Sequence, residues 1–175
     1  MEIDCGACFL RALVPDDAIT LAELANDRDI WLNLRDRFPH PYSVADAEAW
    51  IASSSASTPQ STFGIIVDGQ AVGSISLMPG QDIERVSAEI GYWLGRPFWG
   101  RGIMTDAVRA ATRYAFGMLQ MQRVFAVPFV HNVASCRVLE KAGYVLEGTM
   151  KQSAIKDGVI LDQYLYAAYG EIRRS

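Results

Sequence analysis

A turn in which an arginine lies between two glycines gives the middle of this chain the means to bind phosphate. An apolar, aromatic strand pattern over Ile90–Leu94 runs into Trp99-Gly100-Arg101-Gly102-Ile103-Met104, where a helical pattern begins. Glycines let the backbone approach an anion, free amides of a first helical turn point at it, and Arg101 adds a charged donor. The order predicts a phosphate-bearing ligand at the carboxyl end of a strand.

Two common nucleotide-binding loops fit this turn poorly. A Walker-type loop needs a Gly-Lys-Ser/Thr sequence, which does not follow here. A dinucleotide-binding loop needs a third glycine as its helix opens, and Gly100 and Gly102 are not followed by one. A glycine-rich turn that binds no ligand is the structural alternative.

Glu89 is the second residue that could do chemistry, because it lies inside the apolar strand pattern Val86–Leu94. A carboxylate without a partner is costly to bury. Strand alternation places Glu89 on one face with Ser87, Gly91 and Trp93. Beside a water-filled cleft it could accept the proton of an incoming ammonium, directly or through water. The alternative is a solvated or paired carboxylate that only positions a substrate.

Composition excludes several kinds of partner. The chain has 175 residues, half of them apolar, and a formal charge of −4, which argues against nucleic acid as a partner. There is no polybasic run for a membrane surface, and no apolar run approaches the ~20 residues that span a bilayer. This length predicts one domain over residues 1–175.

The cysteines favour a reducing cytoplasm. There are three, Cys5, Cys8 and Cys136, and an odd number without a secretory signal does not fit a disulfide framework. Cys5 and Cys8 form a C-x-x-C, but no second pair completes a tetrahedral metal site. We therefore expect no bound metal and interpret the two as incidental thiols, with metal or redox chemistry as the alternative.

The elements that must position these residues follow a mixed α/β order. Asp-Gly pairs predict two hairpin turns, and Gly143 lies where a left-handed helix end is expected. Strand patterns cover Cys8–Val14, Thr62–Val67, Gln70–Met78, Val86–Leu94, Arg123–Phe129, Tyr144–Ala154 and Val159–Tyr169. Helical patterns follow Pro15, lie within Asn26–Arg37, and cover Ser43–Ser54, Ile103–Leu119 and Ala134–Ala142. These patterns predict a twisted mixed sheet with helices on both faces.

Together with that order, two motifs resemble the GNAT superfamily of acetyl-CoA-dependent N-acetyltransferases. The turn at 99–104 is similar to the family's pyrophosphate loop, Q/R-x-x-G-x-G/A. The segment 132–144, Asn-Val-Ala-Ser-Cys-Arg-Val-Leu-Glu-Lys-Ala-Gly-Tyr, is similar to the N-x-x-S-x-R-V-L-E-K-x-G-F helix of the branch with the Rim-type ribosomal-protein N-terminal acetyltransferases. The resemblance covers essentially the whole chain.

The resemblance implies an enzyme that moves an acetyl group from acetyl-CoA directly to a primary amine. The acceptor it implies is a protein or peptide N-terminal α-amine, or a small-molecule amine. A homodimer is compatible with it. The alternative is a non-catalytic acyl-CoA-binding or sensor domain, because Leu139 and Ala154 stand where many relatives carry a tyrosine acid and some carry a glutamate base.

The resemblance also implies roles for particular residues. Asn132 would hold the pantetheine arm and Ser135 would approach the sulfur, although Asn and Ser are also favoured helix caps. Backbone amides of Trp93 and Leu94 would face the thioester carbonyl. The implied cofactor-binding set is Tyr92, Trp93, Leu94, Trp99, Gly100, Arg101, Gly102, Ile103, Met104, Asn132 and Ser135. Glu89 and Ser135 are the catalytic candidates.

A proline-flanked loop is expected on the substrate side in this fold. It holds His40 between Pro39 and Pro41, and the candidates in and before it are Trp31, Arg35, His40 and Tyr42. His40 is an alternative base because an imidazole titrates near neutrality. The alternative for all four residues is an ordinary surface loop.

Overall fold

The computed structural model describes residues 1–171. The chain divides into two compact units, Met1–Ser76 with Tyr92–Ala107 and Leu77–Gly91 with Val108–Ser175. Strands β4 (Gln70–Pro79) and β5 (Ser87–Leu94) and helix α4 (Ile103–Gly117) each run from one unit into the other. One domain over residues 1–175 stays a prediction.

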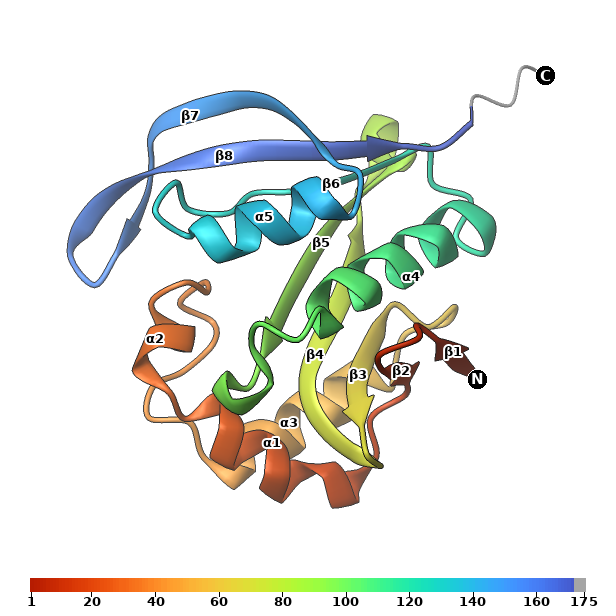
Figure 1. The fold of residues 1–175 in the computed structure, drawn as a ribbon, viewed down its shortest axis with the longest axis vertical. Helices are drawn as coiled ribbons and strands as arrows, with labels where there is room; N and C mark the ends of the chain where they lie inside the picture. The colour runs from red at the N-terminus through yellow and green to blue at the C-terminus, as the bar shows by residue number, and fades with distance from the viewer. Residues whose placement is uncertain (172–175) are drawn as a thin grey trace. The chain divides into compact units, whose positions relative to one another are not determined.

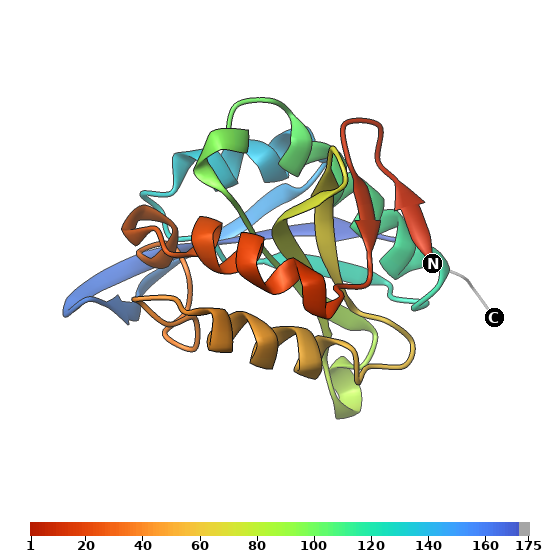
Figure 2. The same ribbon diagram turned by 90° about the horizontal axis from the view of Figure 1, so that it is seen from below.

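The first unit is built on an antiparallel ladder. Strand β1 (Glu2–Asp4) pairs with β2 (Phe9–Arg11), β2 with β3 (Thr62–Val67), and β3 with β4. Between β2 and β3 it has a 3₁₀ turn (Pro15–Asp17), α1 (Ala18–Ala25), α2 (Arg28–Trp31) and α3 (Val44–Ser54). Helices α1 and α3 lie side by side (Figures 1 and 2) and bury a shared apolar cluster that includes Leu21 and Ile51.

The second unit contains one parallel and two antiparallel pairings. Strand β5 runs parallel to β6 (Arg123–Ala126), and β6 is antiparallel to β8 (Val159–Tyr169). Strand β8 also pairs with β7 (Val145–Lys156), and the two form the long hairpin in Figure 1. Helix α5 (Val133–Lys141) connects β6 to β7.

The eight strands are hydrogen-bonded in the order β1-β2-β3-β4-β5-β6-β8-β7. Because β5 and β6 are parallel and the other described pairs are antiparallel, the sheet is mixed. This confirms the predicted mixed α/β class.

Local sequence signals account for most element ends. Ser43 caps α3 by accepting a bond from the Asp46 amide, and the Asp46 carboxylate accepts one from the Ser43 amide, which is the predicted capping box. Both Asp-Gly hairpin turns form with positive φ angles, and Gly143 ends α5 at φ +93°. These turns confirm the two predicted hairpins and the predicted end of the helix.

Two strand predictions were wrong at their ends, and one strand was missed. Strand β1 was not predicted, because Glu2-Ile3-Asp4 is too short to show a pattern. The predicted strand over Arg123–Phe129 ends at Ala126, two residues before Pro128, which has no amide for a ladder. The first predicted strand likewise shrinks to Phe9–Arg11.

Gly73 allows β4 and the end of β5 to approach closely. A methyl group built at Gly73 would lie 2.3 Å from the carbonyl oxygen of Trp93, far inside van der Waals contact. The partner atom is backbone and cannot rotate away. Only glycine therefore fits here without separating the strands.

An ion pair ties β2 to the start of α1. Arg11 donates two bonds to the Asp17 carboxylate, at 2.7 and 2.9 Å, and the Val14 amide donates a third at 2.9 Å. Burial raises the pKa of Asp17, but the bonds from Arg11 and Val14 together lower it by more. The pKa of Asp17 therefore lies below its ordinary value.

We expect Asp17→Asn to lower the free energy of unfolding by about 2 kcal/mol at neutral pH, because the variant leaves Arg11 without its charged acceptor. A folded-state pKa below the unfolded value of about 3.9 stabilises the protein above that pH and less as pH falls through the folded pKa. Denaturant unfolding at pH 7 and at pH 3 measures both effects. A difference between wild type and variant that is as large at pH 3 as at pH 7 would contradict the linkage.

Candidate functional site

The Gly-Arg-Gly turn has the backbone geometry of an anion cradle. Gly100 and Gly102 adopt φ angles of +73° and +79°, and no atom lies within 4 Å of where a methyl group would stand at either position. Left-handed residues alternating with right-handed or extended ones turn successive amides toward one point. A bound phosphate requires this open space. A side chain at either glycine would fill it.

Helix α4 adds its N-terminus to this turn. The Asp106 amide bonds to the Gly102 carbonyl at 3.1 Å, so the amides of residues 103–105 have no acceptor within the helix. The side chains of Ile103 and Met104 are buried, which fixes the first turn in the core. The positive end of a 15-residue helix therefore lies directly after the two glycines.

Trp99 connects the cradle to the end of β5. Its Nε1 donates a 2.7 Å hydrogen bond to the carbonyl of Leu94, and the guanidinium of Arg96 lies 5.2 Å from its ring centre. Arg101 is exposed, with its guanidinium 5.5 Å from the ring of Phe98. A charged group that could reach a phosphate thus stands at the cradle.

Backbone alternation along β5 separates the amides that the resemblance implied. The Gly95 amide bonds to Val72 of β4, so the amide of Trp93, two residues earlier, also faces β4. Amides of Tyr92 and Leu94 face the opposite edge, where the Trp99 bond to Leu94 also lies. Of the two predicted donors, Leu94 alone presents its N–H to that edge. The side chain of Trp93 packs against Phe38, with ring centres 5.7 Å apart.

Glu89 is placed at the last pair of the parallel ladder. The register runs from Ser87 opposite Arg123 to Glu89 opposite Phe125, and β5 continues for five residues beyond it. Glu89 is half-buried, between the fully buried side chains of Ala88 and Ile90 on the other face. Glu89 therefore lies where the parallel register of β5 and β6 ends.

The start of α5 has the geometry of a helix cap. Asn132 precedes the helix, and its side-chain oxygen accepts a 3.2 Å bond from the Ser135 amide. Both residues are half-buried. Burial raises the pKa of the next residue, Cys136, and Leu139 is fully buried. The capping role of Asn132 is therefore real, and any cofactor contact is additional to it.

Two substitutions separate these roles. Asn132→Ala removes the cap and should cost about 1 kcal/mol of unfolding free energy, whereas Asn132→Asp keeps a capping oxygen and most of that stability. If Asn132 also donates an amide N–H to the pantetheine arm, both variants lose acetyl-CoA affinity. Thermal unfolding and calorimetric titration measure the two quantities. Unchanged affinity in Asn132→Asp would leave Asn132 a helix cap alone.

The four substrate-side candidates lie in the first unit with unequal exposure. The rings of Trp31 and His40 stack with centres 5.6 Å apart, and Arg35 and His40 are exposed. Tyr42 is buried in the cluster between α1 and α3, where burial raises its pKa to about 12. Its ring packs on Phe38 at 4.7 Å, so its evident role is packing. Arg35 and the Trp31–His40 stack are the accessible part of this set.

Two polar clusters escaped the sequence analysis. Arg96 binds Asp27 and Asp29 in the first unit, and Tyr166 donates a 2.9 Å bond to Glu140 in the second. Burial, and after it the bond to Glu140, raises the pKa of Tyr166, so its hydroxyl stays protonated. Each cluster joins residues far apart in sequence. The one sequence signal for either cluster was Arg96, a charged residue two positions after the β5 pattern.

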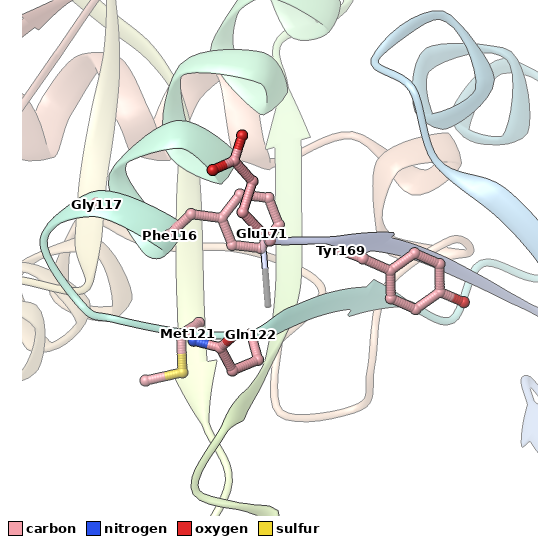
Figure 3. A pocket seen from close by; sticks show the side chains of 7 residues that line it. Phe116, Gly117, Met121, Gln122, Tyr169 and Glu171 are labelled. Atoms are coloured by element: carbon pink, nitrogen blue, oxygen red, sulfur yellow. The ribbon is translucent and has the colours of Figure 1, made fainter. Parts of the chain in front are cut away.

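A pocket of about 340 Å³ in the second unit involves none of these candidates (Figure 3). It lies where the end of α4, the start of β6 and the end of β8 meet. The pocket is lined by Phe116, Gly117, Met121, Gln122, Tyr169, Gly170 and Glu171. The Tyr169 hydroxyl, at one end of the lining, donates a hydrogen bond to Glu147.

Two other features are absent from residues 1–171, the part of the chain that the structure describes. No helix there is long and apolar enough to cross a membrane. No group of three or more His, Cys, Asp or Glu side chains in that range is arranged to hold a metal ion.

The strand, the cradle and the helix that follows form a strand–turn–helix unit suited to a phosphate-bearing ligand. Residues 8–145 match the family model of the acetyltransferase (GNAT) domain, and the chain belongs to that family.

Individual relatives agree with this assignment. The putative ribosomal N-acetyltransferase YdaF of Bacillus subtilis (strain 168) is 36% identical over 104 residues, 59% of this chain and 56% of that protein. The probable N-acetyltransferase YjcK of the same strain is 38% identical over 107 residues, 60% of this chain and 59% of that protein. The chain thus spans less than two thirds of the length of these relatives.

A solved structure supports the fold. RimL, a ribosomal L7/L12 alpha-N-protein acetyltransferase in complex with coenzyme A, superposes with a TM-score of 0.84 over 97% of this chain and 98% of that one, at 23% identity. The superposition shows that the two chains share a fold.

Proposed function

We propose that this protein is an N-acetyltransferase that transfers an acetyl group from acetyl-CoA directly to a primary amine. The observation that carries the proposal is the cradle, in which Gly100 and Gly102 hold left-handed backbone over open space directly before helix α4. The relatives named N-acetyltransferases support the same reaction.

Acetyl-CoA supplies the activated acetyl group when bound. The amides from Gly100 to Met104 would hold its pyrophosphate, with Arg101 adding charge and Trp99 fixing the turn on β5. The Leu94 amide, on the edge opposite β4, would donate to the carbonyl oxygen of the acetyl group. Asn132 and Ser135 would contact the pantetheine arm and the sulfur, as the family motif implies.

We assign Glu89 the role of general base. An α-amino group has a pKa near 8 and must lose its proton before it can attack. A half-buried carboxylate at the end of a parallel ladder can accept that proton directly or through one water. Ser135 would donate a hydrogen bond to the departing sulfur, and solvent would supply the proton.

The acceptor that the relatives favour is a peptide or protein N-terminus. YdaF is named a putative ribosomal N-acetyltransferase, and RimL is named a ribosomal L7/L12 alpha-N-protein acetyltransferase. Small-molecule amines are the second class, supported by a relative in Escherichia coli named an L-amino acid N-acetyltransferase. A cytoplasmic location and a homodimer fit this proposal. Light scattering of the purified chain measures its oligomeric state.

The test is acetyl-CoA-dependent thiol release across N-terminal peptides, lysine peptides, amino acids and polyamines. Turnover with one class would support the enzyme and identify its acceptor. Tight acetyl-CoA binding without turnover on any of them would favour an acyl-CoA-binding or sensor domain. Absence of acetyl-CoA binding would overturn the proposal.

A further inference from the structure

An ion cluster outside the cradle joins the loop that leads into it to helix α2. Arg96, in the 3₁₀ turn Arg96–Phe98, donates from Nε and Nη2 to the two oxygens of Asp27, both at 2.8 Å. Nη2 also donates to Asp29. A guanidinium that binds one carboxylate through two parallel bonds fixes both direction and distance, which a single point charge does not.

The Asp27 carboxylate serves two purposes at once. Besides binding Arg96, its Oδ1 accepts a 2.8 Å bond from the Asp29 amide and so caps α2. The Arg96 guanidinium, together with these amide bonds, lowers the pKa of Asp27 to about 2. A helix of four residues does not hold its place by its own backbone bonds, so it depends on this cap and on the buried side chain of Ile30.

The far ends of this cluster reach both candidate binding regions of the first unit. On the cradle side, Arg96 lies over Trp99, which is bonded to the Leu94 carbonyl. On the other side, α2 ends at Trp31, which stacks on His40. No other described ion pair joins residues 95–99 to the segment 26–42.

We propose that Arg96 is a positioning residue that couples acetyl-CoA binding in the cradle to the order of α2 and the Trp31–His40 stack. The coupling rests on the proposed function, because its first step is the binding of acetyl-CoA in the cradle. When the ligand fixes residues 95–104, the bidentate pair transmits that constraint to Asp27 and tightens the cap of α2. By linkage, an acceptor bound at α2 tightens acetyl-CoA by the same factor.

Hydrogen exchange, followed by mass spectrometry with and without acetyl-CoA, tests the coupling without any acceptor. In the wild-type protein we expect acetyl-CoA to slow exchange both in residues 99–105 and in residues 28–34, the latter by about 5-fold or more. In Arg96→Gln the first effect persists and the second is lost. Arg96→Lys keeps the charge without the bidentate geometry and should retain part of it.

The matched control is Arg28→Gln, which removes an arginine from α2 itself. Its guanidinium lies over the Trp31 ring, 5.7 Å from the centroid, whereas Arg96 reaches Asp27 and Asp29 from the turn before the cradle. It should keep the transmitted protection. When an acceptor is known, Arg96→Gln should raise the acceptor KM more than it lowers kcat, a split that general destabilisation does not produce.

Three results would overturn the coupling. They are protection of residues 28–34 that is unchanged in Arg96→Gln, no protection of them in the wild-type protein, and loss of acetyl-CoA binding in Arg96→Gln, which would make Arg96 part of the cofactor site. If acetyl-CoA does not bind the wild-type protein, the proposed function fails first. The coupling then fails as well, and faster exchange of residues 28–34 in free Arg96→Gln than in free wild type would show only that the ion pair orders α2.

Discussion

Gly102→Ala should weaken acetyl-CoA binding by about 30-fold. The methyl group enters the open space at the cradle and opposes the left-handed backbone, so at least one charge-assisted amide bond to the pyrophosphate is lost. Such a bond contributes about 2 kcal/mol, which corresponds to that factor in Kd. Calorimetric titration of acetyl-CoA measures the change directly.

The chain offers a matched control in Gly69, at the turn between β3 and β4. Its φ is +80°, nearly that of Gly102, and a methyl group there also meets open space. Gly69→Ala and Gly102→Ala should therefore lose similar stability, about 1 kcal/mol each, while Gly69→Ala keeps its acetyl-CoA affinity. Equal acetyl-CoA affinities in the two variants would contradict the assignment of the cradle as the pyrophosphate site.

Glu89→Gln should lower kcat by about 100-fold or more at pH 7, because proton transfer by a positioned base contributes 10²–10⁴-fold. Acetyl-CoA binding should be unchanged, since Glu89 is assigned to the amine. The loss should shrink as pH rises past about 8, where an α-amine deprotonates without help. A pH profile of kcat for both proteins, with the acceptor found in the panel, measures this.

The control for Glu89→Gln is Glu84→Gln, which makes the same chemical change on the exposed 3₁₀ turn Asp82–Glu84. It should leave kcat and its pH profile as they are. A kcat for Glu89→Gln within a few-fold of wild type would mean that the carboxylate only positions the substrate, and His40 would then be tested by His40→Gln. The acetyltransferase assignment does not depend on this outcome.

The elements of the fold that follow from local signals could be predicted from sequence. Capping residues, Asp-Gly turns and the glycine after α5 each act within a few positions, so their effects can be seen in a short window. Strand β1 could not be predicted, because its three residues gain their stability from pairing with β2. Strand β6 ended early because Pro128 breaks a ladder that the apolar pattern continues.

The candidate site was predictable to the extent that it is a motif. Gly100, Gly102 and the start of α4 lie together in the chain, and the structure gives them the expected backbone. The Arg96 cluster was not predictable, because its partners are separated by 69 residues and meet only after the first unit folds. The directions of the Trp93 and Leu94 amides were not predictable either. They follow from the pairing of β5 with β4, which turns the Leu94 amide toward the edge away from β4.

The close approach at Gly73 limits how far this protein can vary. A saturation library over β4 should return a range of apolar residues at the neighbouring core positions Val72 and Ile75 but only glycine at 73, since the obstacle is the carbonyl of Trp93. Any larger residue would push the end of β5 outward and displace the turn that begins six residues after Trp93. Gly73 thus sets the distance between β4 and the end of β5. A substitution there would disturb the cradle although β4 contributes no side chain to it.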